Sequence, residues 1–150
     1  MGLTRLRAFL RRHTRIALDT SIFIYQLEAT RRYLALTNVV FSWAERAGHD
    51  AVTSTITMTE LLVPSYRDKD ENRVDAFFGL LTTYPNLRWI APDLETADLA
   101  AKLRAQYRMR TPDALQAATA IRARATGFVT NDPVFARIGE LDTVVLDRML

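Results

Sequence analysis

Residues 111–132, Thr111-Pro-Asp-Ala-Leu-Gln-Ala-Ala-Thr-Ala-Ile-Arg-Ala-Arg-Ala-Thr-Gly-Phe-Val-Thr-Asn-Asp132, decide the fold of this chain. Thr111 suits a helix N-cap, and Pro112 suits the first helical position, where its missing N–H breaks no hydrogen bond. Apolar residues then recur at helical spacing, and we expect this helix to end at Gly127. The apolar run Phe128–Thr130 that follows is typical of a buried parallel strand. The stretch therefore predicts a helix that leads directly into a strand.

Two carboxylates mark the ends of these elements. Asp113 comes in the first turn of the predicted helix, and Asp132 directly follows the predicted strand. The small side chains of Ala117 and Ala118 would let the helix approach a sheet closely. In a parallel sheet, the ends of the strands and the starts of the next helices open on the same edge. Both acids are therefore candidates for one site.

The rest of the chain repeats this alternation of short apolar runs and amphipathic helical patterns. We expect strands at 15–19, 51–54, 87–91 and 143–146, helices at 22–48, 55–65, 74–84 and 93–107, and one helical turn at 133–138. Gly48 should close the first of these helices, and Pro64 should end or bend the second. Short strands that alternate with helices predict an α/β sandwich with a mainly parallel sheet. No internal repeat or linker appears, so we expect a single domain over residues 1–150.

The composition fits one globular domain. A chain of 150 residues can form a substantial core, and 49% hydrophobic with 25% charged residues argues against a disordered protein. No apolar run reaches the length of a membrane span. Arg11-Arg12 hints at a twin-arginine export signal, but Asp19 interrupts the apolar stretch that follows it. We therefore predict no targeting segment and a cytoplasmic protein.

Few residue types remain for catalysis. The chain has no cysteine, and its two histidines, His13 and His49, share no metal-ligand spacing. Thiolate chemistry is thus excluded, and a zinc site or a histidine general base is disfavoured. Any metal must be bound by oxygen ligands, which favours Mg²⁺ or Mn²⁺.

The basic residues are almost all arginine, since Lys69 and Lys102 are the only lysines. The guanidinium group pairs well with phosphate oxygens, although a solvated surface in an arginine-favouring composition explains the same bias. Four arginines lie in residues 2–14, which form either a short amphipathic helix or a partly ordered arm. We expect residues 1–14 to be a basic N-terminal extension of the domain.

Four acids lie near the ends of the predicted elements, and each has a purely structural explanation. Asp19 and Asp132 precede helices and suit N-caps, while Asp113 suits the helix dipole. Glu60 stands three residues after Thr57, which is the spacing of a capping box.

Taken together, the positions of the four acids indicate a shared site. Two fall at strand ends and one at a helix start, and Glu60 lies six residues after the second strand, so all four can converge on one edge of the sheet. Glu60 also has Ile56 and Val63 as neighbours on its own helix face, and a solvent-facing glutamate would more often have polar neighbours there. Helix caps alone do not require an acid at every one of these places.

Clustered carboxylates would raise one another's pKa unless a cation neutralised them. A hard divalent ion does so with oxygen ligands while it keeps bound waters. Such an ion can activate a water as the nucleophile, stabilise charge on a phosphoryl group and orient in-line attack. The acids therefore predict a metal-dependent phosphodiesterase.

Four segments also resemble, in order, the sequence blocks of PIN-domain ribonucleases: Ile16–Ser21, Thr57–Leu61, Thr111–Ala118 and Val129–Phe135. The closest likeness is to the VapC-type toxins of bacterial toxin–antitoxin pairs, and it extends from about residue 15 to the C-terminus. Each block alone is a weak signal, but four blocks in order with their acids are specific. The basic segment before residue 15 exceeds what most such toxins carry.

The resemblance implies a PIN-like three-layer α/β/α sandwich and a Mg²⁺- or Mn²⁺-dependent endoribonuclease that hydrolyses RNA. It also implies a homodimer, inhibited by a small cognate antitoxin whose C-terminal segment lies across the site. Carried over by position, it assigns these roles: Asp19 and Asp113 as principal metal ligands, Glu60 and Asp132 completing the cluster directly or through water, Thr20 and Thr130 as hydroxyl neighbours, and Asn131 in support.

Arg108 and Arg110, just before Asp113, are candidates for contacts with RNA phosphates, although an exposed loop often carries arginines for other reasons. The main alternative function is a catalytically silent module of the same fold that binds RNA or protein. Other α/β phosphoryl enzymes are disfavoured. A haloacid-dehalogenase phosphatase would need an acid at Ser21, and the chain has neither a P-loop nor a receiver-domain acid pair. A Gly-x-Ser-x-Gly serine hydrolase motif is also absent.

Overall fold

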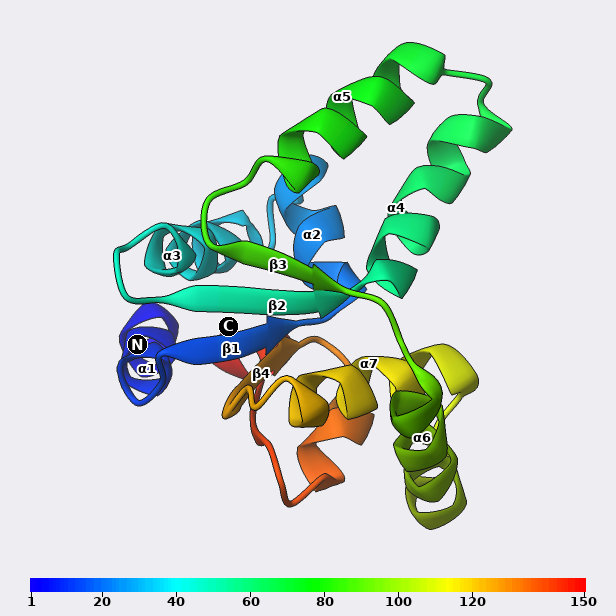
Figure 1. Cartoon of the computed structure of the whole chain (residues 1–150). Helices are drawn as coiled ribbons and strands as arrows, with labels where there is room; N and C mark the ends of the chain where they lie inside the picture. The colour runs from blue at the N-terminus through cyan, green and yellow to red at the C-terminus, as the bar shows by residue number, and fades with distance from the viewer.

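Five parallel strands form the centre of the molecule, and the computed structural model describes all 150 residues (Figure 1). The strands are β1 (Arg15–Leu18), β2 (Asp50–Ser54), β3 (Leu87–Ile90), β4 (Gly127–Thr130) and β5 (Asp142–Val145). Their order in the sheet is β3-β2-β1-β4-β5, and all four neighbouring pairs run parallel. The predicted α/β fold with a parallel sheet is confirmed.

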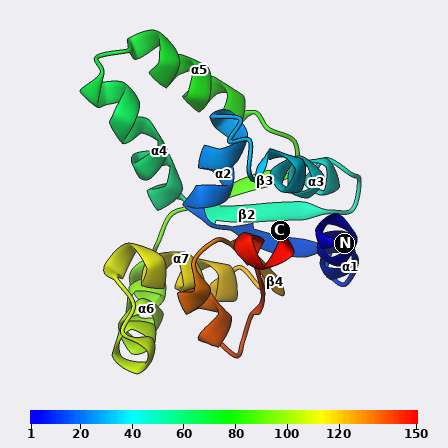
Figure 2. The ribbon, with the colours of Figure 1, turned by 180° about the vertical axis from the view of Figure 1, so that it is seen from behind.

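Helices cover both faces of this sheet, which gives three layers (Figures 1 and 2). They are α1 (Gly2–Arg11), α2 (Thr20–Leu27), α3 (Leu34–Ala44), α4 (Thr55–Arg67), α5 (Glu71–Thr82), α6 (Leu94–Tyr107), α7 (Thr111–Arg122) and the short 3-10 helices η1 (Pro133–Arg137) and η2 (Leu146–Met149). Helices α6 and α7 pack on one face, and α1, α2 and α3 pack on the other. None of the helices combines the length and the hydropathy that crossing a bilayer would require.

Each face of the sheet has its own apolar core, because successive residues of a strand point to opposite sides. Ile16 and Leu18 of β1 belong to the core under α1–α3, whereas Ala17 belongs to the core under α6 and α7. On the second face Ala117 and Ala118 of α7 are fully buried, as their small size predicts. The alanines bring α7 close to the sheet and so fix the position of its first turn.

The helix predicted at residues 22–48 is in fact two helices. Helix α2 ends at Leu27 with Ala29 in the left-handed region at φ 49°, and the N–H of Thr30 donates to the carbonyl of Tyr25, so the chain turns before α3 begins. Helix α3 ends at Ala44, ahead of Gly48, whose φ of +85° belongs to the loop that follows. The apolar period continues across the break because both helices bury residues against the same face of the sheet.

Pro64 does not end its helix. Helix α4 continues to Arg67, and α5 starts at Glu71 after a turn in which Lys69 has φ 54°. The two helices form a hairpin that projects from the body of the molecule, at the upper right in Figure 1.

Two predicted helix boundaries in the 111–132 stretch are wrong. The N-cap of α7 is Arg110 rather than Thr111, and α7 ends at Arg122 rather than Gly127. Gly127 instead opens β4, where an added Cβ would lie 2.9 Å from a ring carbon of His13. Its small size is therefore required by close packing and not by a helix end.

Residues 2–14, expected as a basic extension, are part of the core. Helix α1 buries Leu6, Phe9 and Leu10 completely or nearly so in the larger apolar cluster. His13, which follows this helix, is itself buried and its Nε2 lies 2.7 Å from the carboxylate of Asp142. The segment is thus tied both to the core and to β5, the edge strand of the sheet.

Candidate active site

The carboxyl ends of β1 and β4 meet where the strand order reverses, since the chain runs from β1 outward to β3 and then returns to β4 beside β1. In open α/β sheets this reversal leaves a crevice outside the strand ends, where ligands bind. Asp19 follows β1 directly, and Thr130 is the last residue of β4. Two of the residues predicted from the sequence, Asp19 and Thr130, therefore lie at the switch point of this sheet.

Asp19 is held at this edge by two hydrogen bonds. Its Oδ1 accepts from the backbone N–H of Thr20 at 2.8 Å, which caps α2, and its Oδ2 accepts from the hydroxyl of Thr130 at 2.8 Å. The residue is 9% exposed. The structural explanation of Asp19 as an N-cap is correct, but the bond to Thr130 also fixes the second oxygen, which a cap does not require.

The pKa of Asp19 is raised to about 6, mainly by burial and also by the charges of Asp113 and Glu60, although the hydrogen bonds from Thr130 and Thr20 act in the opposite direction. Glu60 of α4 and Asp113 of α7 thus both affect the ionisation of the buried Asp19. A negative site of this kind gains stability from a bound cation.

Glu60 is joined to this group through Thr20. The hydroxyl of Thr20 donates to Oε1 of Glu60 at 3.0 Å. Glu60 is exposed to solvent, so the apolar surroundings expected from Ile56 and Val63 are not found. The capping box is also wrong, because Ser54 is the N-cap of α4 and accepts from the N–H of Ile56. Glu60 therefore has a site partner and no capping role.

A buried polar network that the sequence analysis missed supports Thr20 from below. Nε2 of Gln116, a residue of α7 that is 3% exposed, lies 2.6 Å from the hydroxyl of Thr57 and 3.4 Å from that of Thr20. Thr53 donates to the carbonyl of Leu18 at 2.9 Å, so Thr57 must donate to Thr53 at 2.8 Å and accept from Gln116.

This network connects β1, β2, α4 and α7 directly beneath the acids. With the proton of its hydroxyl given to Glu60, Thr20 can only accept from Gln116. A long polar side chain among the alanines of α7 was a signal for Gln116, but its partners come from three other elements.

Asp113 lies in the first turn of α7, where the helix dipole favours its charge. Its side chain is 16% exposed, and its Oδ2 lies 3.3 Å from Nε of Arg110. Arg110 is therefore an ion-pair partner of a site carboxylate, and its guanidinium is 78% exposed. Arg108, the other predicted phosphate contact, is the left-handed C-cap of α6 and has no ion pair.

Asp132 caps η1 by accepting from the N–H of Val134 at 3.0 Å, so its structural explanation is correct. Its own N–H donates to the hydroxyl of Thr130, which in turn donates to Asp19. Asn131 bonds to the hydroxyl of Tyr25 and to the N–H of Asp147, and neither partner is one of the four acids. Asn131 thus fastens β4 to α2 and η2.

The donors at this edge fit a hard cation in their chemistry, because all of them are carboxylate or hydroxyl oxygens. No three His, Asp or Glu side chains lie close enough together to coordinate one ion among them. The arrangement therefore fits an ion that one or two carboxylates hold directly and that keeps water in the rest of its shell, as Mg²⁺ commonly does.

Comparison with known proteins places this site in context. Three solved structures have the same fold: a toxin–antitoxin complex from Klebsiella pneumoniae (TM-score 0.64, 23% identity, covering 87% of this chain and 97% of the other), VapBC2 from Rickettsia felis bound to a promoter DNA fragment (0.66, 20%, 87% and 98%) and FitAcB from Neisseria gonorrhoeae (0.64, 20%, 87% and 97%). A search of curated proteins gave no match.

The model of one protein family matches most of the sequence. It is described as the PIN domain and covers residues 16–141, from the second residue of β1 to the residue before β5. This range contains all four acids and the Gln116 network, and it leaves out α1. The chain therefore belongs to the PIN domain family.

Proposed function

We propose that this PIN-domain chain is a divalent-metal-dependent endoribonuclease and the toxin of a bacterial toxin–antitoxin pair, acting in the cytoplasm. One observation carries the proposal: a buried aspartate at the switch point of the sheet, whose pKa is raised to about 6 by burial and by two further acids from different helices. A structural cap does not need those two neighbours.

The chain's own groups divide the work. Asp19 and Asp113 would hold a Mg²⁺ or Mn²⁺ ion, with Thr130 and the N–H of Thr20 fixing both oxygens of Asp19. When bound, such an ion would supply the positive charge that lowers the pKa of water and stabilises a phosphoryl group under attack. Glu60 is exposed and oriented by Thr20. It can therefore accept a proton from a water molecule at the same edge of the sheet.

Arginine contributes to the binding of an RNA substrate. Arg110 stands beside Asp113 with its guanidinium largely in solvent, so it can contact a phosphate that approaches the acids. With Arg108 at the end of α6, it forms a basic rim next to an acidic centre. Such a rim binds the phosphodiester backbone without reading its sequence.

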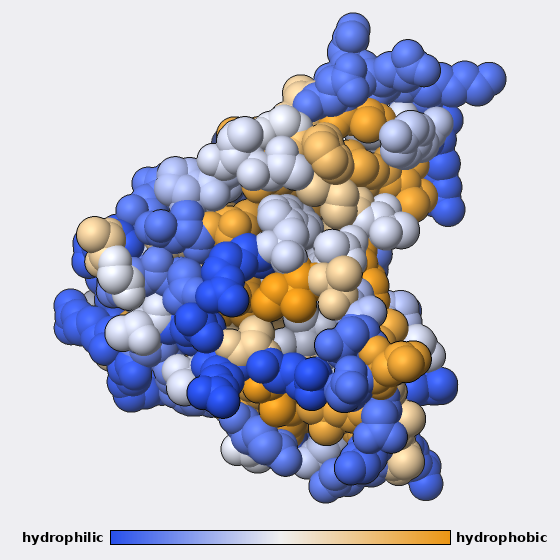
Figure 3. Space-filling model, viewed as in Figure 1, coloured by the Kyte–Doolittle hydropathy of each residue, from blue (hydrophilic) through white to orange (hydrophobic).

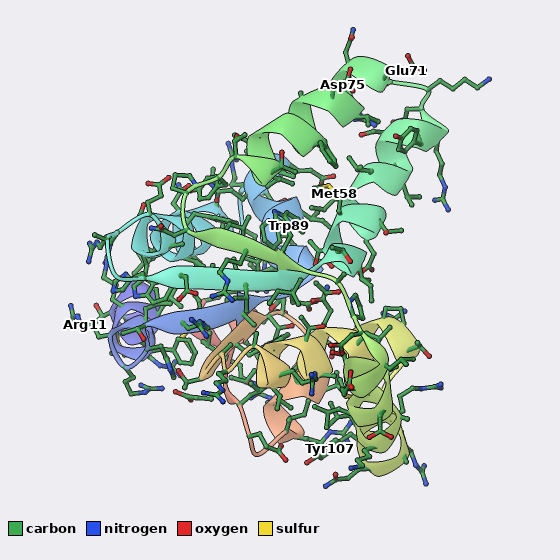
Figure 4. All side chains as sticks on the ribbon, in the orientation of Figure 1. Arg11, Met58, Glu71, Asp75, Trp89 and Tyr107 are labelled. Carbon is green, nitrogen blue, oxygen red and sulfur yellow. The ribbon has the colours of Figure 1, made fainter.

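A protein partner is supported by an apolar surface between α4, α5 and β3. This surface surrounds a groove of about 660 Å³ lined by Met58, Leu62, Val63, Tyr66, Phe78 and Trp89. Figure 3 shows the orange patch between the arms of the hairpin, and Met58 and Trp89 are labelled in Figure 4. An exposed apolar groove of this size favours coverage by a cognate antitoxin or by a second copy of the chain. Two of the similar structures are described as a toxin–antitoxin complex and as VapBC2, so both of those proteins were solved as assemblies.

The activity is tested with purified protein, mixed RNAs and Mg²⁺ or Mn²⁺. We expect cleavage that stops when EDTA is added and that is lost in Asp19→Asn and Asp113→Asn. Asp98→Asn is the matched control, since Asp98 is an exposed acid of α6 whose ion-pair partner is Lys102 and not a residue of the site, and it should leave cleavage unchanged. Cleavage that persists equally in Asp19→Asn would instead identify a contaminating nuclease or another site.

The second candidate is a silent module of the same fold that binds RNA or protein without cutting it. It is favoured by the absence of a group of three ligands already in place for an ion. Metal-linked stabilisation separates the two functions. If millimolar Mg²⁺ or Mn²⁺ raises the melting temperature of the wild type but not of Asp19→Asn, the metal site is supported. An unchanged melting temperature supports the silent module.

A further inference from the structure

A second groove lies between α1 and α3, on the side of the molecule opposite the acids. In Figures 1 and 2 these helices lie together at the amino ends of the strands, and Arg11 of α1 is labelled at that end in Figure 4. The groove has a volume of about 420 Å³. Helix α1 forms one wall and is outside the residues that match the PIN family model.

The rim of this groove carries unpaired positive charge. Arg7 and Arg11 come from α1, and Arg46 follows α3. None of the three guanidinium groups makes a hydrogen bond or an ion pair within the chain, whereas nine other basic side chains have acidic partners. No acidic side chain lines the groove. The charge therefore has to be balanced by solvent ions or by a ligand.

One residue that lines the groove, Trp43, has a polar group without a partner. Trp43 is 5% exposed and lines the groove, and its buried indole N–H has no acceptor. The other tryptophan, Trp89, donates its indole N–H to the carbonyl of Leu81 at 3.2 Å. A buried donor without an acceptor destabilises the folded state, and the environment of this N–H is therefore sensitive to what covers Trp43.

Between the arginines the groove is lined by apolar residues at helical spacing, together with the uncharged polar residues Asn38 and Ser42. Leu3 and Leu10 are two turns apart on α1, and Ala35 and Val39 are one turn apart on α3. From Ala35 to Trp43 the wall runs for about 12 Å at 1.5 Å per helical residue. A groove with apolar residues at helical spacing and a basic rim fits the apolar stripe and flanking acidic charges of an amphipathic helix.

We propose that the groove between α1 and α3 binds an acidic amphipathic helix of a protein partner. Its apolar stripe would cover the leucines, and its carboxylates would pair with Arg7, Arg11 and Arg46. RNA fits less well, because the groove offers no exposed aromatic face on which bases could stack. The only aromatic residue of the groove, Trp43, is buried and already stacked on His49 with ring centroids 4.3 Å apart. This inference does not depend on the proposed nuclease activity.

The test follows the two indole N–H signals of ¹⁵N-labelled full-length protein in NMR spectra. The probe is a stapled helical peptide of about 18 residues, with a leucine stripe flanked by glutamates and a twin in which every glutamate is glutamine. Adding the glutamate peptide should move the Trp43 signal and leave that of Trp89 in place, because the latter already has its acceptor. The glutamine twin should bind at least tenfold more weakly.

Charge reversal identifies the groove as the binding place. The double variant Arg7→Glu/Arg11→Glu should bind the glutamate peptide at least tenfold more weakly than the wild type. The matched variant Arg124→Glu/Arg137→Glu changes the net charge equally at exposed positions outside the groove and should bind it normally. Melting temperatures within a few degrees of the wild type show that both variants fold.

Other results overturn the proposal. Equal loss in both double variants would mean that the peptide binds to the net charge of the protein. A Trp43 signal that moves with single-stranded oligouridine but not with the glutamate peptide would assign the groove to nucleic acid. A Trp43 signal that moves with protein concentration alone would assign it to a second copy of the chain. No movement with the glutamate peptide at millimolar concentration would leave the groove without this ligand.

Discussion

Asp19 combines bonds that favour its charge with surroundings that oppose it. Thr130 and the N–H of Thr20 stabilise the carboxylate, but burial together with Asp113 and Glu60 outweighs them and raises its pKa from 3.8 to about 6. An unfolded chain would ionise Asp19 more easily. Asp19 is therefore protonated in the folded protein, and ionised in the unfolded chain, between about pH 4 and 6. Ionisation of Asp19 lowers the stability of the fold unless a bound cation balances its charge.

We predict that, in EDTA, protonated Asp19 contributes to the free energy of unfolding. This contribution is fully present below pH 3.8 and is lost as the pH rises through about 6. Relative to Asp19→Asn, which cannot titrate, the wild type should lose about 2 kcal/mol of unfolding free energy between pH 4.5 and 7.5. Urea denaturation of both proteins at the two pH values measures this difference.

Added Mn²⁺ provides the complementary measurement for the same residue. At pH 7.5 the ion should restore stability to the wild type and not to Asp19→Asn. Parallel stability curves for the two proteins across this pH range would show that the pKa of Asp19 is not raised in the folded state.

Gln116 is the second residue with a testable role, because it carries the network that orients Thr20. Gln116→Leu leaves Thr57 without its donor, and we expect about 1–3 kcal/mol of lost stability. It should also lower kcat for RNA cleavage about tenfold with little change in KM, since Thr20 is no longer held toward Glu60.

Thr119→Val is the matched control for Gln116→Leu. Thr119 is equally buried on α7, but its hydroxyl donates to the carbonyl of Leu115 within the same helix. The control should lose stability without losing kcat at temperatures where both variants are folded. An equal fall of kcat in both variants would reduce Gln116 to an ordinary core residue.

At the scale of elements, helix α1 shows how a charged segment can be part of a core. Its arginines dominate the sequence, but Leu6, Phe9 and Leu10 form one buried stripe. We predict that Leu6→Ala costs about 2–5 kcal/mol of stability, as large-to-small core changes do. Leu94→Ala, at an 86% exposed position, should change it by less than about 0.5 kcal/mol. Chemical denaturation measures the unfolding free energy of both variants. Equally small effects would mean that α1 does not contribute to the core.

The helices differ in how closely the sequence predicts their ends. Helix α6 was predicted nearly to its ends because Asp93 caps it and its pattern stands alone. The break between α2 and α3 was missed because Ala29 takes a left-handed conformation that the sequence does not mark with glycine. Pro64 is tolerated within α4 although it is a strong local stop signal. Local signals failed where packing between elements favoured another backbone path.

At the scale of the whole molecule, the apolar hairpin surface predicts self-association in the absence of an antitoxin. Tyr66 is 62% exposed and Phe78 is 50% exposed on this surface. We expect a dimer by size exclusion with light scattering, and a shift toward monomer in Tyr66→Ser/Phe78→Ser. Leu94→Ser, on α6, should remain dimeric. A dimer that survives the double change would leave the hairpin surface free for a different partner.

The sequence by itself determined the fold class and the edge at which Asp19, Asp113 and Asp132 lie. Alternating strands and helices allow few topologies, and a parallel sheet brings the ends of its strands to one edge. Only the tertiary structure decided that Gln116 reaches Thr57, that α1 completes the core and that Trp43 keeps an unpaired N–H beside three arginines. These contacts depend on the angles and distances between packed elements, and those are set by the whole core and not by any local pattern.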